Sequence, residues 1–399
     1  MTSVTVPYAA WYGDTRHVLE FPDGWKVSVR RVRGAPALSE EQMRAALASP
    51  IGAKPLSALA EGRKRAVVIV DDLTRPTPAD KLLPLILEEL KRGGLREDHV
   101  RVVMGIAAHR PMVGPDLDKK LGSGLADRLE VLNHNPYENL VSLGSSSRGT
   151  PIELNADVYE ADLKIGVGSI VPHPTGGFGG GGKIVLPGVV SMTTIEHNHS
   201  KIPAVGKHGF VEGNLIRADM EEAARKAGLD FIVNMVVTEQ RGVAGLFAGD
   251  LVEAHRRGVA LARALYGIGP LEKADILVAN AYPIDSEFLQ SGKALWASSE
   301  ATRENGTVVL VDAASEGFGH HYLLERGRAR GSRAQTQPAG QPARRLLVYS
   351  PSLASTAVRR IYPYAELLRT WPEIVEELLN LHGRDATVTV LPTAAIQCS

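Results

Sequence analysis

The sequence predicts an α/β protein with two domains, each a mostly parallel or mixed sheet flanked by helices. Short apolar, β-branched runs alternate with longer amphipathic segments, and this alternation restarts after a glycine-rich break from Gly267 to Pro270. At 399 residues, the chain is long enough for two domains of ordinary size. We therefore predict an N-terminal domain over residues 1–268 and a C-terminal domain over residues 269–399.

Hydrophobic periodicity predicts the individual elements. Apolar residues recur at helical spacing after the first buried strand and stop at Gly93 and Gly94, which indicates a helix that ends at residue 92. A stretch rich in Arg, Gly, Gln, Ser and Pro, residues 327–344, predicts a mobile surface loop. The predicted strands are 65–70, 100–106, 163–170, 231–237, 274–279, 308–311, 346–349 and 387–391, and the other helices are 220–227, 251–265, 288–298 and 365–379.

Composition excludes several classes of protein. Hydrophobic residues make up 44% and charged residues 23% of the chain, and the formal net charge is zero, so bulk electrostatics does not favour nucleic-acid or anionic-membrane partners. The single cysteine, Cys398, excludes an internal disulfide framework and a cysteine-rich metal site. The apolar runs are too short to span a bilayer, and no secretory signal is visible at the N-terminus. We expect a cytoplasmic protein.

Polar residues cluster where the predicted strands end. Asp71 and Asp72 follow the first strand, His109 follows the second, and His173 follows the third, while residues 282–293 follow the first strand of the second domain. Ligands of open α/β sheets collect outside the carboxyl ends of the strands, often between domains. The sequence thus predicts an active site in the crevice between the two domains.

The glycine-rich segment that ends at Lys183 is the most unusual part of the chain. Six of the seven positions 176–182 are glycine, which we interpret as difficult to explain by packing, because glycine loses the most backbone entropy on folding. Such a loop lets backbone N–H groups approach a phosphate closely, and Lys183 can add a charge or a covalent attachment point. The spacing matches neither the Walker pattern nor the dinucleotide-binding fingerprint.

Histidines supply the candidate acid–base and metal chemistry. His109 and His173 each follow a strand and can act as general acid or base near neutral pH. His197 and His199 would share a face if their segment were a strand, and imidazole binds nickel, zinc or copper. With no cysteine nearby and few acids, a metal held partly by a cofactor fits better than an all-protein site. We interpret His320 and the histidine after it as surface residues.

Two further clusters are compatible with a structural or a functional role. Residues 71–78 can form a capped strand-to-helix turn, but the guanidinium of Arg75 suits a carboxylate or phosphate. Gln290 and Lys293 share one face of the predicted helix and form either a solvated surface or an anion site.

Together these motifs resemble the lactate racemase family, the nickel-pincer nucleotide enzymes. The resemblance covers most of the chain and rests on joint order and spacing, with the lysine sixteen residues before the last histidine of the motif. The segments that carry it are residues 72–76, 109–111, 172–173, 179–183, 197–199 and 290–293.

The resemblance implies an isomerase whose cofactor is pyridinium-3,5-bisthiocarboxylic acid mononucleotide, with nickel held by a ring carbon and two sulfur atoms. It implies that Lys183 is linked to this cofactor, that His199 completes the nickel coordination, and that the N-terminal domain binds the nucleotide. Partners would be a small 2-hydroxy acid and the cofactor-biosynthesis proteins. The further residues implied at the site are Asp72, Thr74, Gly179, Gly180, Gly181 and Gly182 for the cofactor, and Arg75, Gln290 and Lys293 for the substrate.

The implied reaction inverts the C2 centre of a 2-hydroxy acid by hydride transfer to the cofactor. Two bases are needed because the enantiomers place their hydroxyl groups differently, and His109 and His173 would fill these roles. Leu289 stands where the family's lactate racemases carry a tyrosine, so the substrate can differ from lactate. The alternatives are an epimerase of a larger polyhydroxy acid or sugar, a cofactor-binding protein without turnover, and a metal-dependent hydrolase, which the scarcity of acidic ligands disfavours.

Overall fold

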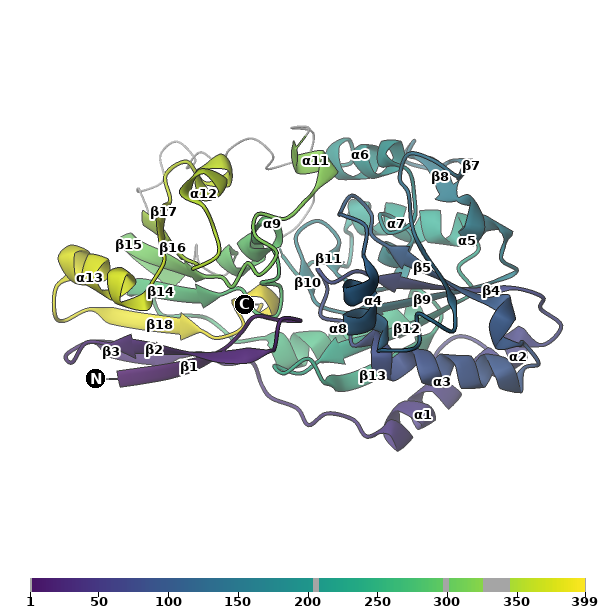
Figure 1. Ribbon diagram of the computed structural model, residues 1–399, viewed down its shortest axis with the longest axis horizontal. Helices are drawn as coiled ribbons and strands as arrows, with labels where there is room; N and C mark the ends of the chain where they lie inside the picture. Colours follow the sequence, from purple (N-terminus) through teal and green to yellow (C-terminus); the bar gives the residue numbers. More distant parts are fainter. Residues whose placement is uncertain (1, 204–207, 297–300, 326–344, 399) are drawn as a thin grey trace. The chain divides into compact units, whose positions relative to one another are not determined.

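The computed structural model describes residues 2–203, 208–296, 301–325 and 345–398, and the chain divides into two compact units (Figure 1). The larger unit comprises residues 35–263 and 321–323, and the smaller unit comprises 1–34, 264–320 and 324–399. One boundary thus lies near the predicted division at 268. Residues 1–34, however, differ from the predicted assignment, because strand β3 (Lys26–Val29) pairs in parallel with β18 (Thr387–Leu391) of the smaller unit.

A six-stranded sheet of order β13-β12-β9-β4-β5-β6 forms the centre of the larger unit, and all its pairings are parallel except β12 with β13. Helices α6 and α7 lie above β4 and β9 in the view of Figure 1, and α3 lies below them. Strands covered on both faces are expected to be apolar throughout, and residues 66–70 are all buried. The strands are β4 (Ala66–Asp71), β5 (Val100–Gly105), β6 (Glu130–Asn133), β9 (Leu163–Ser169), β12 (Phe231–Val237) and β13 (Val243–Gly249), beside the pairs β7 (Leu140–Ser145) with β8 (Pro151–Asn155) and β10 (Pro172–His173) with β11 (Gly177–Phe178).

The helices of the larger unit present apolar stripes to this sheet. In α3, three of the four predicted apolar positions, Leu83, Ile86 and Leu90, are fully buried, and Leu87 is half-buried. The helix ends at Gly93, where a Cβ atom would lie 2.2 Å from the carbonyl oxygen of Ser57, so a side chain cannot be accommodated there. The helices are α1 (Glu40–Ala48), α2 (Leu56–Ala60), α3 (Ala79–Arg92), α4 (Gly114–Leu121), α5 (Ala156–Glu160), α6 (Met192–Ser200), α7 (Leu215–Lys226) and α8 (Glu253–Tyr266), with the 3-10 turns η1 (Glu97–His99) and η2 (Gly181–Ile184).

The smaller unit contains an all-parallel sheet of order β17-β16-β15-β14-β18-β3 and a hairpin of β1 and β2. Phe21 and Trp371 pack edge to face in its core, with ring centroids 5.6 Å apart. Its further elements are β1 (Thr2–Tyr8), β2 (Thr15–Phe21), β14 (Ala274–Asn280), β15 (Thr302–Val311), β16 (Arg345–Tyr349), β17 (Glu366–Leu368), α9 (Phe288–Ser291), η3 (Gly292–Leu295), α11 (Tyr322–Glu325, partly in the larger unit), α12 (Ser355–Ile361), α13 (Trp371–His382) and η4 (Ala394–Ile396).

Two of the predicted helices have bounds that differ from those in the structure. Residues 365–379 divide into strand β17 and helix α13, because Thr370 and Glu373 form a capping box that begins the helix at Trp371. Residues 288–298 form only the short helix α9 and the 3-10 turn η3, with 297–298 outside the described residues. The loop predicted at 327–344 also lies outside the described residues.

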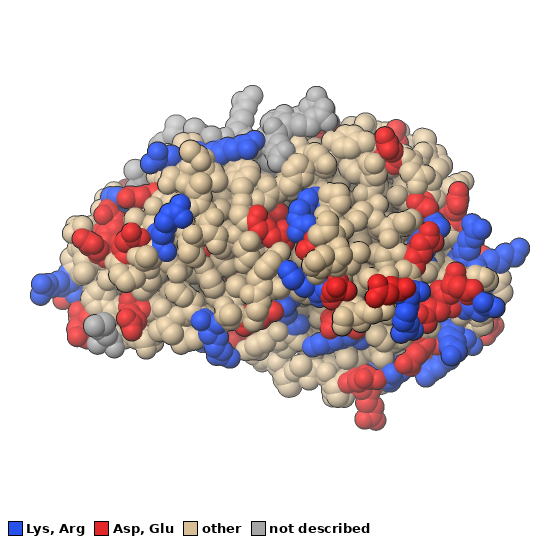
Figure 2. Space-filling model, in the orientation of Figure 1, with Lys and Arg blue, Asp and Glu red and all other residues tan. Residues whose placement is uncertain are grey.

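The fold class itself is confirmed: both units are α/β, with parallel or mixed sheets flanked by helices. On the face drawn in Figure 2, acidic and basic side chains are interspersed, in keeping with the formal net charge of zero. In the described part of the chain, no helix is long and apolar enough to cross a membrane.

Candidate active site

The loop that leaves β4 builds a hydrogen-bonded chain around Asp72. His109 Nδ1 lies 2.6 Å from Asp72 Oδ2, and the Thr74 hydroxyl donates to Asp72 Oδ1 at 2.5 Å. Arg75 Nη1 in turn donates to Thr74 Oγ1 at 2.8 Å. The sequence produces this arrangement because β4 and β5 are parallel neighbours, so the residues after their carboxyl ends meet.

The Asp72 carboxylate is ionised. Burial raises its pKa, but the opposing effects of the His109 imidazole, Arg75 and the Thr74 hydroxyl hold the pKa well below its usual value. A carboxylate at this distance accepts the Nδ1–H hydrogen of His109, which leaves Nε2 of the neutral ring as the basic nitrogen. This geometry is compatible with the predicted role of His109 as a general base.

His173 has the opposite hydrogen-bond pattern. It lies on β10, is buried, and its Nδ1 accepts from the Gly176 backbone N–H at 3.3 Å. In the neutral ring the hydrogen is then on Nε2. Both predicted acid–base residues are consequently held through Nδ1, and their Nε2 atoms differ in protonation: that of His109 is basic and that of His173 bears the hydrogen.

Lys183 lies in η2, among charged groups of the same unit. Burial lowers the pKa of its amine well below 10.5, and the guanidinium groups of Arg75 and Arg217 lower it further, against the opposite effect of Asp72. An amine is nucleophilic only in its neutral form, and a lowered pKa increases the share of that form. The direction of the shift therefore favours a covalent attachment at Lys183.

The glycine loop is packed tightly, so the interpretation that packing could not explain it is wrong. A Cβ atom at Gly177 would lie 2.2 Å from the Phe210 carbonyl oxygen, and one at Gly179 would lie 2.5 Å from that of Ser169. At Gly180 the φ angle is +72° and a Cβ atom would lie 2.6 Å from an Asn234 side-chain oxygen. These positions need glycine whether or not a ligand binds.

Two amides of the loop already have protein partners. The Gly179 N–H donates to the Val171 carbonyl at 2.8 Å, and the Gly181 N–H donates to Asn234 Oδ1 at 2.7 Å. In this arrangement these two N–H groups are not directed at a phosphate. The predicted cradle of Gly179, Gly180, Gly181 and Gly182 remains a prediction, with Gly180 and Gly182 as its remaining candidate donors.

His197 and His199 lie on helix α6, so the condition under which both rings would share one face, a strand, is not met. Residues two apart on a helix point in nearly opposite directions. His199 Nδ1 donates to the Ile195 carbonyl at 3.1 Å, which leaves Nε2 unprotonated. A backbone carbonyl on one imidazole nitrogen with a lone pair on the other is the usual state of a metal-ligating histidine, so His199 fits the predicted nickel ligand.

The predicted substrate residues Gln290 and Lys293 belong to the smaller unit. Both are buried, and the Lys293 ammonium donates to Gln290 Oε1, which confirms that they share one face. The half-buried Leu289 precedes them, and its N–H donates to the Phe318 carbonyl at 3.1 Å. The crevice between the units stays a prediction, as do the roles of these residues.

His320 and His321 were predicted to be surface residues, but both are half-buried. The His321 ring packs at 5.1 Å from the His109 ring, measured between centroids. His321 thus lies beside the predicted base, and its position just after a Gly-Phe-Gly turn gave no sign of this.

Sequence reasoning also missed the buried groups that support the site. Lys120 is fully buried and donates to the Asp72 and Arg75 carbonyls at 2.8 and 3.0 Å, while its ammonium pairs with Asp71 at 2.7 Å. It therefore holds the loop after β4 in place. Asn234 had a detectable signal, because it is a polar residue in the middle of an apolar strand.

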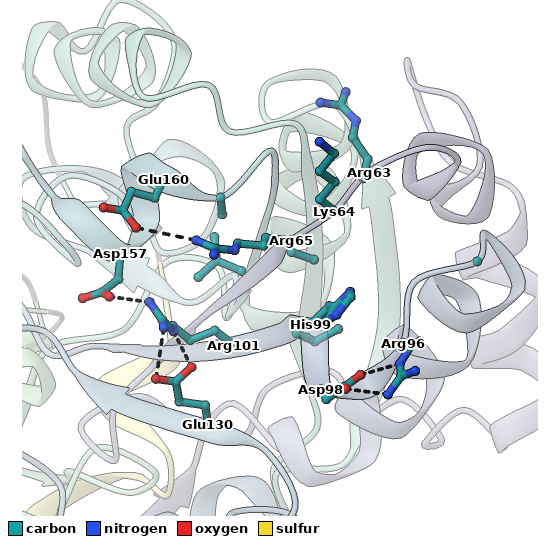
Figure 3. A pocket seen from close by; sticks show the side chains of 15 residues that line it. Arg63, Lys64, Arg65, Arg96, Asp98, His99, Arg101, Glu130, Asp157 and Glu160 are labelled. Atoms are coloured by element: carbon teal, nitrogen blue, oxygen red, sulfur yellow. Dashed lines mark hydrogen bonds and ion pairs between the residues drawn. The ribbon is translucent and has the colours of Figure 1, made fainter.

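The pocket in Figure 3 is separate from these residues. It has a volume of about 690 Å³ and lies near the starts of β4, β5 and β6, the amino ends of the parallel strands. Its charged side chains pair with one another: Arg101 with Glu130 and Asp157, and Arg96 with Asp98 (Figure 3). None of the predicted site residues lines it, and exposed ion pairs of this kind contribute only about 0–1 kcal/mol each.

Comparison with known proteins shows which family the chain belongs to. The model of the lactate racemase N-terminal domain matches residues 12–208. The chain is 31% identical to the lactate racemase of Lactiplantibacillus plantarum over 88% of this chain and 89% of the relative, and 31% identical to that of Thermoanaerobacterium thermosaccharolyticum over 80% and 76%. The structure of the Thermoanaerobacterium lactate racemase apoprotein superposes with a TM-score of 0.79 at 25% identity, covering 100% of this chain and 99% of that one. A crystal structure of a Thermotoga maritima protein has a TM-score of 0.69 at 19% identity, covering 90% and 98%, and supports the fold alone.

The protein is therefore an enzyme of the isomerase class, a racemase. The chain belongs to the lactate racemase family, which confirms the predicted resemblance.

Proposed function

We propose that this racemase inverts the C2 centre of a 2-hydroxy acid, with lactate as the leading substrate, using a nickel-pincer nucleotide. The observation that carries the proposal is the grouping, within one compact unit, of a histidine held by a buried carboxylate, a buried lysine with a lowered pKa and a histidine whose Nδ1 is held by a backbone carbonyl. Lactate is the substrate named for the two curated relatives, each 31% identical to this chain. The cytoplasmic location and the partnership with cofactor-biosynthesis proteins remain predictions.

Lys183 and His199 are the residues that would hold the nickel-pincer nucleotide: the lysine by a covalent bond and the histidine as a nickel ligand through Nε2. When bound, this group accepts and returns the C2 hydride of the substrate. Among the described residues, no three His, Cys, Asp or Glu side chains are placed to hold a metal by themselves.

The proton chemistry belongs to His109 and His173. In the resting arrangement, Nε2 of His109 can accept the proton of a substrate hydroxyl, and the resulting imidazolium is stabilised by the ionised Asp72 at 2.6 Å. His173 presents Nε2–H and can hydrogen-bond to the oxygen of the enantiomer that His109 does not serve. Arg75, Gln290 and Lys293 supply cationic and amide groups suited to a carboxylate.

Substitution of the two histidines tests this assignment. We expect His109→Ala and His173→Ala each to lower kcat for racemisation by about 10²–10⁴-fold, the usual contribution of a positioned acid–base group. Nickel and nucleotide content, measured by elemental analysis and intact mass, should remain at the wild-type level. Loss of nickel in either variant would contradict their role as acid–base residues.

The substrate is tested separately with a panel of enantiopure 2-hydroxy acids and sugar acids. Turnover of lactate or another small 2-hydroxy acid supports the proposal. Turnover confined to larger polyhydroxy substrates would favour the alternative, an epimerase, which Leu289 in place of a tyrosine keeps open.

A further inference from the structure

Helix α7 carries two buried charged residues that the proposed chemistry does not use. Arg217 is 1% exposed and Asp219 is 0% exposed. Because they are two positions apart on a helix, they point toward different neighbours. Arg217 contacts the loop that leads to Lys183, and Asp219 contacts helix α6, which carries His199.

Asp219 gathers three donors around one carboxylate. It accepts from Ser146 Oγ at 2.5 Å, from Thr150 Oγ1 at 2.8 Å and from Asn198 Nδ2 at 2.8 Å. Since the Thr150 hydroxyl hydrogen goes to Asp219, its oxygen accepts from His197 Nδ1, 2.9 Å away. The two residues that immediately precede His199 are thus both tied to Asp219, one directly and one through Thr150.

Arg217 holds the glycine-rich loop in a similar way, through several hydrogen bonds. Its guanidinium donates to the carbonyl oxygens of Gly176 and Gly180 at 3.0 and 2.9 Å, and also to that of Phe178. A planar guanidinium that binds three carbonyls of one loop fixes the course of that loop toward Lys183. Burial lowers the pKa of Arg217 to about 10, so it remains charged at neutral pH.

The loop also lies directly against α7. A Cβ atom at Gly182 would lie 2.8 Å from the Met220 carbonyl oxygen and 3.0 Å from Glu221 Cα. This close contact leaves little freedom for η2 to move relative to the helix. Both supports of the candidate cofactor site consequently originate from the same five-residue stretch of α7, residues 217–221.

We propose that α7 is the positioning element of the cofactor site, in which Asp219 fixes the orientation of the His199 helix and Arg217 fixes the loop that carries Lys183. The helix thereby sets the spacing between the metal ligand and the attachment amine. This inference rests on the proposed roles of Lys183 and His199.

The test of the Asp219 half measures nickel release from the holoenzyme into excess chelator, together with the mass of nucleotide bound at Lys183. Removing a group that orients a metal-ligating histidine typically costs about 10–100-fold in metal affinity. We expect Asp219→Asn to accelerate nickel release by at least about tenfold, while the nucleotide mass at Lys183 persists. The matched control is Ser146→Ala, which removes a hydrogen bond to the same carboxylate but none of its links to α6.

Thr150 provides a milder variant pair if Asp219→Asn does not fold. Thr150→Val keeps the shape of the side chain and breaks the His197 link, whereas Thr150→Ser retains the hydroxyl. We expect faster nickel release in the first variant and near wild-type release in the second. Equal release rates in Thr150→Val, Ser146→Ala and wild-type protein would overturn the role of Asp219.

The role proposed for Arg217 is tested by the amount of nucleotide attached to Lys183. We expect Arg217→Lys, which keeps the charge but cannot bind three carbonyls, to lower the fraction of chains with nucleotide on Lys183 by at least about tenfold, a loss that a misplaced reactive group commonly produces. Nickel per attached nucleotide should not change. Unchanged attachment in a folded Arg217→Lys protein would overturn this half, whereas wild-type protein that binds neither nickel nor nucleotide would contradict the proposed function and this inference with it.

Discussion

At the scale of single residues, the proposed acid–base chemistry depends on the pair of Asp72 and His109. The carboxylate is buried, ionised and 2.6 Å from Nδ1 of the ring, so it selects the tautomer with a basic Nε2. Thr74 and Arg75 add two further hydrogen bonds in series. The pair is a positioned base rather than a surface ion pair.

Asp72→Asn tests this pair. The amide keeps the shape but can donate to Nδ1 and so favours the wrong tautomer, and we expect kcat to fall by about 10²–10⁴-fold. The same variant should retain nickel and nucleotide if Asp72 acts mainly through His109. Wild-type kcat would show that the 2.6 Å contact has no part in the reaction.

A second prediction at the scale of single residues concerns stability, and it follows from the lowered pKa of Lys183. Between the lowered pKa of the folded state and 10.5, the unfolded chain binds a proton at Lys183 that the folded chain does not, so this residue makes stability rise with pH across that interval. Below the lowered pKa the penalty for burying the ammonium is fully present. Lys183→Met should therefore raise the free energy of unfolding of the cofactor-free protein at pH 7 by about 1 kcal/mol or more.

Chemical denaturation at pH 7 and at pH 10 measures this effect, and the advantage of the variant should shrink at the higher pH. The exposed Lys226 provides the control, because Lys226→Met should change stability by no more than about 0.5 kcal/mol. A variant at position 183 that is less stable than wild type at pH 7 would contradict the neutral, desolvated amine.

At the scale of elements, the glycine-rich segment 176–182 shows that sequence and structure can give different reasons for the same residues. The sequence pointed to ligand binding because glycine is costly, whereas the structure shows backbone and side chains in contact with almost every glycine. Contacts with Phe210 and Asn234 come from distant parts of the chain, so local sequence could not reveal them.

Gly180→Ala and Gly62→Ala separate packing from backbone strain. The φ angles are +72° and +73°, but a Cβ atom at Gly62 has no neighbour within 4 Å, whereas one at Gly180 lies 2.6 Å from Asn234 Oδ1. We expect Gly62→Ala to cost about 1–2 kcal/mol of stability from strain alone. Gly180→Ala should cost at least about 1 kcal/mol more, measured by urea denaturation. Equal losses of stability in the two variants would mean that the loop accommodates a Cβ atom at Gly180 without a packing penalty.

Elements with strong local signals were predictable, and those set by tertiary contacts were not. Strands 231–237 and 387–391 were predicted with the observed bounds because they are short runs rich in apolar and β-branched residues. The helical state of His197 and His199 was missed because the segment has few apolar residues, and its helix depends on the Ser191 cap and on buried contacts with α7. Likewise, Lys120 and Arg217 carried no sequence signal, since a buried cation looks the same as an exposed one until its partners are known.

At the scale of the whole molecule, the predicted site residues divide between the two compact units. The acid–base residues, the lysine and the candidate metal ligand lie in the larger unit, and Gln290 and Lys293 lie in the smaller unit. The family resemblance alone linked these two groups. The order of the chain also concealed that residues 1–34 complete the sheet of the smaller unit through β3.

Lys293→Met tests whether the smaller unit contributes to substrate binding. Loss of a charge-assisted contact to a carboxylate costs about 1.5–3 kcal/mol, so we expect KM to rise by about 10–100-fold, with nickel and nucleotide content unchanged. Arg96→Ala, in the pocket of Figure 3, is a charge control outside the predicted site residues and should leave KM unaltered. An unaltered KM in Lys293→Met would contradict a shared site.

The most direct measurement follows the C2 hydrogen. Nickel-loaded protein is incubated with L-lactate deuterated at C2, and the D-lactate formed is analysed by chiral separation and mass spectrometry. We predict that D-lactate appears and keeps deuterium at C2, because the hydrogen moves as a hydride while His109 and His173 exchange only the hydroxyl proton. Replacement of the deuterium by solvent hydrogen, or no D-lactate from fully loaded protein, would contradict the proposed reaction.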